Sequence, residues 1–141
     1  MRIHKDLVVW KQSIALAVEV YKLTATFPKQ ETYGLGQQMR RAAVSVASNI
    51  GEGAARGSKK EFIRFLRIAA GSLSELDTQM EIADAIGMGD IEQRLGVRLK
   101  SDIVARMLSG LIRSMARRNP VAHEVREGSH AAGYLSPVTS H

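Results

Sequence analysis

Apolar side chains recur at steps of three and four residues along most of the chain, which is the spacing of one face of an α-helix. Four runs of this kind can be traced, and they consist of Leu7, Trp10, Ile14, Ala17, Val18 and Tyr21; Leu35, Met39, Ala42, Ala43, Val46 and Ile50; Phe62, Phe65, Leu66, Ala69, Leu73, Leu76, Met80 and Ala83; and Ile91, Leu95, Leu99, Ile103, Met107, Leu108, Leu111 and Met115. No turn-bounded segment alternates between apolar and polar residues as a strand does. The pattern predicts an all-α protein whose helices bury these four runs.

The segments between the runs carry signals that end one helix and begin the next. Ser58 and Glu61 have the spacing of a capping box, and Asp90 follows a Gly-Met-Gly segment as an N-cap for the fourth helix. The connections are short, so neighbouring helices are expected to run in opposite directions. This predicts an antiparallel up-down-up-down four-helix bundle over residues 1–117.

The last part of the chain, residues 118–141, departs from this pattern. It contains two prolines, two glycines and few large apolar residues, so we expect a flexible C-terminal tail. Elsewhere, no apolar stretch has the length of a secretory signal or a transmembrane helix. The sequence therefore predicts a cytoplasmic protein without a membrane partner.

Charge is distributed unevenly along the chain, which has a net charge of +6 and a pI near 10.0. Residues 54–67 carry five basic side chains against one acid, residues 72–92 carry six acids and no base, and residues 93–118 carry seven bases against one acid. Cations at the start of the third helix oppose the helix dipole, so local stability does not explain them. Simple solvation is one interpretation, and an anionic ligand or an acidic partner is the other.

Nucleic acid is the polyanion that we consider first. The candidate binding residues are Arg56, Lys59, Lys60, Arg64, Arg67, Arg106, Arg113 and Arg117.

Several kinds of chemistry are disfavoured by the residues present. The glycines of residues 51–57 follow a predicted helix with GxGxxxG spacing, which differs from both a dinucleotide fingerprint and a Walker motif. The chain has no cysteine, and its four histidines, His4, His123, His130 and His141, all lie near its ends. We therefore predict no metal site, no cofactor and no enzymatic activity.

Glu52 is unusual because a carboxylate near the C-terminus of a helix meets the unfavourable end of the dipole. We expect compensation from the first amides of the third helix or from an arginine such as Arg56, Arg64 or Arg67, so that Asn49 and Glu52 hold the corner between the second and third helices. If Glu52 holds this corner, Glu52→Ala should lower the melting temperature. The competing interpretation is a general base, which would need a second acid or base nearby.

One long segment, SVASNIGEGAARGSKKEFIRFLRIAAGSLSELDTQMEIA, closely resembles the four-helix bundle proteins encoded in intervening sequences of bacterial 23S ribosomal RNA genes, often labelled S23 ribosomal proteins. The resemblance covers roughly residues 4–116, and Gly51 replaces the usual alanine. The positions that we assign to the structural motif are Ser45, Asn49, Glu52, Gly53, Ser58 and Glu61. The resemblance implies the bundle fold and an assembly of several copies. A related protein, the accessory variability protein of diversity-generating retroelements, is a basic pentameric bundle that works with a reverse transcriptase and nucleic acid.

Two functional hypotheses follow. The first is a non-enzymatic homo-oligomer, with a pentamer favoured by the resemblance, that binds RNA or DNA through its basic clusters. The second is a structural or adaptor oligomer that binds another protein, such as a reverse transcriptase. Oppositely charged ends of the bundle would suit a head-to-tail ring. Alternatively, Arg94 and Arg98 neutralise part of the acidic block within the chain.

Overall fold

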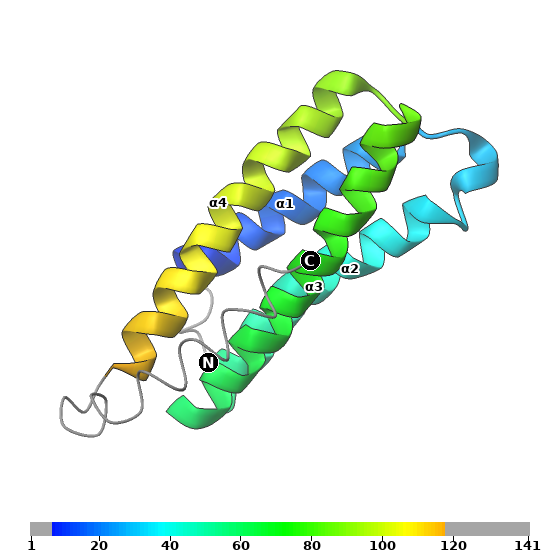
Figure 1. Ribbon diagram of the computed structural model, residues 1–141. Helices are drawn as coiled ribbons and strands as arrows, with labels where there is room; N and C mark the ends of the chain where they lie inside the picture. The colour runs from blue at the N-terminus through cyan, green and yellow to red at the C-terminus, as the bar shows by residue number, and fades with distance from the viewer. Residues whose placement is uncertain (1–6, 118–141) are drawn as a thin grey trace.

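The computed structural model describes residues 7–117, and these residues form four long helices that pack together (Figure 1). The elements are α1 (Val8–Thr24), the short 3-10 helix η2 (Lys29–Glu31), α2 (Leu35–Ala55), α3 (Lys59–Ile86) and α4 (Ile91–Ala116). No strand occurs in this range. The all-α prediction is therefore confirmed for the described part of the chain, and four packed helices fit a bundle. The predicted tail, residues 118–141, lies outside the described residues.

The N-caps and the glycine at the end of α3 act as the sequence predicts, but the Glu61 carboxylate of the expected capping box accepts hydrogen bonds from Arg64 instead of reaching back to Ser58. Ser58 is the N-cap of α3, where its Oγ accepts a hydrogen bond of 3.0 Å from the amide of Glu61. Asp90 is the N-cap of α4, where its carboxylate accepts a bond of 3.0 Å from the amide of Gln93. Gly87 ends α3 with a φ of 66°, a left-handed conformation that glycine adopts at little cost. These caps satisfy amides and carbonyls that a helix leaves unpaired.

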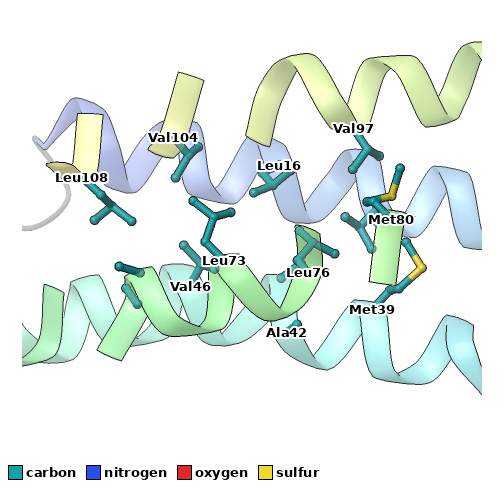
Figure 2. Close-up of a cluster of buried hydrophobic side chains, with 14 of the residues drawn as sticks. Leu16, Met39, Ala42, Val46, Leu73, Leu76, Met80, Val97, Val104 and Leu108 are labelled. Atoms are coloured by element: carbon teal, nitrogen blue, oxygen red, sulfur yellow. The ribbon is translucent and has the colours of Figure 1, made fainter. Parts of the chain in front are cut away.

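The core runs along the inward faces of all four helices (Figure 2). Each helix contacts two others: α1 and α3 both pack against α2 and α4. For α2 and α3 the buried residues follow the predicted runs, including Met39 and Val46 from α2 and Leu73, Leu76 and Met80 from α3. For these two helices the predicted buried faces are confirmed.

For α1 the predicted buried face is right only in part, because Leu7, Trp10 and Ala17 pack against the core whereas Ile14, Val18 and Tyr21 are exposed. For the first half of α4, the predicted face is wrong, because Ile91, Leu95 and Leu99 are exposed. Helix α1 buries Val9, Ser13, Leu16, Val20 and Leu23, and α4 buries Val97, Ser101, Val104, Leu108 and Ile112. Each helix carries apolar residues on two faces, and the face with the bulkier run is the exposed one. The inward faces are hard to recognise in the sequence because each contains a serine among its apolar residues. Both hydroxyls are hydrogen-bonded in the fold: Ser13 Oγ donates to the Val9 carbonyl, and Ser101 Oγ donates to Asp77 of α3.

Two exposed rows result. We call Ile14, Val18 and Tyr21 the α1 row, and Ile91, Leu95 and Leu99 the α4 row.

Small side chains set the spacing of α2 and α3, which form the most extensive helix contact. A Cβ placed on Gly53 would lie only 2.6 Å from the Cβ of Phe65. Further along, Ser45 Oγ and Ser72 Oγ share a hydrogen bond of 2.8 Å between the two helices. The α2–α3 connection is therefore held close, and it fixes where the basic residues at the start of α3 stand.

Candidate nucleic-acid interface

Seven of the eight predicted basic residues lie at one end of the molecule. Arg56 ends α2, and Lys59, Lys60, Arg64 and Arg67 occupy the first three turns of α3. Figure 1 shows that α4 ends at this same end, where it contributes two more arginines. We call this group the basic end, and it consists of Arg56, Lys59, Lys60, Arg64, Arg67, Arg113 and Arg117. Arg106 lies about two turns before Arg113 on α4, away from the others.

Arg56 and Arg64 are held in place around the Phe65 ring. Their guanidinium carbons lie 4.8 and 4.6 Å from the ring centroid, within the range of cation–π contact. Glu61 accepts two hydrogen bonds from Arg64, of 3.2 and 3.3 Å, and one of its oxygens also lies 3.9 Å from Arg56. This network connects the end of α2 to the start of α3. Two of the candidate arginines therefore contribute to the corner as well as to its charge.

The charge of this network is partly neutralised. Glu52 accepts a hydrogen bond of 3.1 Å from Arg56 Nε, and the hydrogen bond from Arg64 holds the pKa of Glu61 below its ordinary value. Both carboxylates are thus acceptors for arginines within the chain. They are the two acids at the basic end among the described residues, against its seven cations, so the surface as a whole stays positive.

The remaining cations differ in their surroundings. Lys60, Arg113 and Arg117 are exposed, as is Arg106, and no ion pair involves any of these four within residues 7–117. Lys59 and Arg67 are half-buried. The exposed cations that form no ion pair within this range are the ones best placed to meet phosphates from solution.

The structural-motif residues take separate roles. Asn49 donates to the carbonyl and hydroxyl of Ser45 at 2.8 and 3.0 Å, and Ser45 in turn bonds across to Ser72 of α3. Of the two partners expected for Glu52, the structure shows an arginine and not the amides of α3. Glu52 pairs with Arg56, four residues further along the chain, and its side chain is 54% exposed. Arg56 carries that contact on to Glu61. No histidine lies within the described residues, and Glu61, the other carboxylate at this corner, is bonded to Arg64.

At the opposite end of α3, arginines of α4 neutralise part of the acidic block. Asp84 is 2.8 Å from Arg94 and 2.7 Å from Arg98, and Arg98 also reaches Glu81 at 2.9 Å. The alternative stated from the sequence, neutralisation within the chain, therefore holds for these two acids. They are less available for an end-to-end contact with the basic end of another copy.

Two polar features of α3 were not foreseen. Asp77 is half-buried beside Ser101 of α4, and burial raises the pKa of this carboxyl. A shallow groove of about 400 Å³ follows the outer side of α3, lined by Gln38, Gly71, Ser74, Glu75, Thr78, Gln79 and Ile82. Within residues 7–117, no three histidine or acidic side chains are grouped to hold a metal ion. Neither feature has a sequence signature, since each depends on which helices become neighbours.

Comparison with known proteins agrees with this architecture of four packed helices. The family model of the 23S rRNA-intervening sequence proteins matches residues 5–110, and the chain belongs to this family. A crystal structure of a protein of unknown function from the S23 ribosomal protein family of Bacteroides thetaiotaomicron is similar in fold, with a TM-score of 0.69. That protein is 23% identical, and the similarity covers 75% of this chain and 96% of the other.

The search of curated proteins finds no match to this chain. None of the helices that the structure describes has the length and apolarity needed to cross a bilayer.

Proposed function

We propose that the protein is a non-enzymatic four-helix bundle that assembles with copies of itself and binds nucleic acid, RNA or DNA, through its basic end. The frame of the proposal is an up-down-up-down order of helices. Short connections support it, as do contacts that pair the end of one helix with the start of the next, such as Gly53 with Phe65 and Asp84 with Arg94.

The observation that carries the nucleic-acid part is the excess of cations at one end of the molecule. The end of α2, the start of α3 and the end of α4 bring together seven basic side chains and two carboxylates, although α4 is remote from the α2–α3 corner in sequence. Arg56 and Arg64 help to hold the α2–α3 corner, but Lys60, Arg113 and Arg117 form no ion pair within residues 7–117, so local stability does not account for these three. Phosphates spaced along a nucleic acid would compensate them.

Self-assembly is supported by the exposed apolar rows on α1 and α4. Large apolar side chains arranged along one helix face and left in solvent mark protein contact surfaces more often than chance exposure does. The family resemblance favours a pentamer. Repeating the basic end in each copy would turn several weak phosphate contacts into one multivalent surface.

The nucleic-acid part is tested by equilibrium binding of labelled RNA and DNA at low salt. Lys60→Gln with Arg113→Gln removes two exposed cations of the basic end, and we expect the dissociation constant to rise by about tenfold. The matched control is Lys29→Gln with Arg41→Gln, which removes the same charge elsewhere and should change affinity far less. Wild-type protein that binds neither RNA nor DNA would refute this part of the proposal.

A second candidate function, an adaptor for another protein, is favoured by one observation on α3. Ile68, Ile82 and Ile86 are exposed on its outer side, apart from both rows. Under this alternative, a single protein partner such as a reverse transcriptase should copurify at fixed stoichiometry, and nuclease treatment should leave the complex intact.

A further inference from the structure

The α1 row and the α4 row are similar in length and chemistry. Ile14, Val18 and Tyr21 are 41, 48 and 52% exposed, and the residues of the α4 row are 59–69% exposed. Spacings of i, i+4 and i+7 or i+8 place each row on one side of its helix. Each row is the face that apolar periodicity alone would have buried. Arg40 of α2 lies over the Tyr21 ring, 5.8 Å from its centroid, and the remaining exposed apolar surface of the two rows is open to another molecule.

The two rows also stand at the same level along the bundle. Within one chain, Lys100 of α4 donates to Gln12 of α1 at 3.2 Å, and Glu19 lies 3.3 Å from the position of a Cβ on Gly96. These contacts set an antiparallel correspondence in which residue numbers on α1 and α4 sum to roughly 112–115. In that correspondence Ile14 is level with Leu99, and Tyr21 is level with Ile91.

We propose that the α1 row of one copy packs against the α4 row of a second copy. The proposal rests on the self-assembly part of the proposed function, and it names the faces that meet. With two bundles side by side, the level correspondence would set Ile14 opposite Leu99, Val18 opposite Leu95 and Tyr21 opposite Ile91. Six apolar side chains would leave water in one continuous seam.

The charges that flank the two rows complement each other in the same register. Lys11 and Lys22 are exposed beside the α1 row, and Glu92 and Asp102 are exposed beside the α4 row. Among the described residues, Lys22 has one distant ion pair, with Glu19 at 3.9 Å, and the other three have none. The register that pairs the apolar residues brings Lys11 level with Asp102 and Lys22 level with Glu92. The partner is therefore best identified as this chain itself, because bases beside one row are level with acids beside the other.

This contact joins two different faces, so each copy keeps one unused face for the next copy. Such a contact produces a ring when rotation closes it and an open filament when it also advances along an axis. Because the two rows stand at the same level, side-by-side packing requires no advance along the bundle. The arrangement favours a closed ring, in which every basic end faces the same way.

The test uses one charged substitution in each row. Val18→Asp blocks the α1 row and Leu95→Asp blocks the α4 row, and we expect each variant alone to be a monomer by light scattering, with self-association weakened by at least about 30-fold. Val44→Asp, a change on α2 at a side chain that is 43% exposed, is the matched control and should assemble as wild type does. Circular dichroism of every variant checks that the helices are intact.

Mixing the two variants gives the decisive result. The Val18→Asp chain retains its α4 row and the Leu95→Asp chain retains its α1 row, so an equimolar mixture should form a heterodimer and nothing larger. Lys11→Glu and Asp102→Lys should each weaken assembly, and the double reversal should restore it. A mixture that stays monomeric, or single variants that assemble like wild type, would overturn the proposed pairing. A wild-type chain that is itself monomeric would refute the self-assembly on which the pairing rests.

Discussion

Gly53 offers a sharp test of how α2 and α3 pack. The substitution Gly53→Ala adds a Cβ that would lie 2.6 Å from the Cβ of Phe65 and 3.3 Å from the carbonyl oxygen of Phe62. Neither atom can rotate away, so the two helices would have to separate. Overpacking of this kind costs roughly 1–3 kcal/mol or more, and the helix propensity of alanine returns about 1 kcal/mol.

We therefore expect Gly53→Ala to lower the unfolding free energy by about 1–2 kcal/mol, and Tm by about 5–10 °C. Thermal denaturation followed by circular dichroism measures this, at a fixed protein concentration because assembly also shifts Tm. Gly71→Ala in α3 is the control: a Cβ there meets no atom within 4 Å, so alanine should stabilise the helix by up to about 1 kcal/mol. If Gly53→Ala is as stable as wild type while Gly71→Ala shows its gain, the close α2–α3 approach is not what glycine provides.

Three further predictions concern charged side chains. Glu52→Ala should cost only about 0.3–0.5 kcal/mol in urea denaturation, because its pair with Arg56 is exposed; a loss of several kcal/mol would show that Glu52 is buried in the assembly. Arg94→Met should cost about 2–4 kcal/mol, because this nearly buried arginine bonds Asp84 and the carbonyls of Met88 and Gly89, whereas Arg113→Met should be near neutral; equal effects would contradict this. For Asp77, burial raises the folded-state pKa, so this carboxyl holds its proton to higher pH in the folded protein than in the unfolded chain. Its contribution to stability therefore falls as pH rises from the ordinary pKa of the carboxyl through the raised pKa of the folded state. Asp77→Asn should match wild type in acid and become relatively more stable toward neutral pH; a variant that is less stable at neutral pH would contradict the sign.

The helices themselves could be predicted from sequence because their signals are local. Ser58 and Asp90 cap helices through residues three positions away, and periodicity over a few turns identifies each helix. For α2 and α3 the buried faces were also predictable, since their largest apolar residues fall on one side. For α1 and α4 two apolar faces compete, and steps of three and four residues cannot decide which one meets the other helices.

The candidate site was predictable as a set of charges but not as an arrangement. The sequence identifies Arg56 and Arg64 as cations, but their contacts with Phe65 and Glu61 require the turn between α2 and α3. Likewise, the acidic block near the end of α3 is visible in the sequence, while its partial neutralisation by Arg94 and Arg98 depends on α4 packing beside it. Contacts between helices decide which charges remain available to a ligand.

The salt dependence of nucleic-acid binding tests the central claim most directly. The logarithm of the dissociation constant would be measured against the logarithm of the salt concentration for wild type, for Lys60→Gln with Arg113→Gln, and for Lys29→Gln with Arg41→Gln. If the basic end contacts phosphates, the first variant should have a slope shallower by about 1.4 on single strands or 1.8 on duplex DNA, and the second should keep the wild-type slope. Equal slopes for all three proteins, or no binding at low salt, would contradict the account.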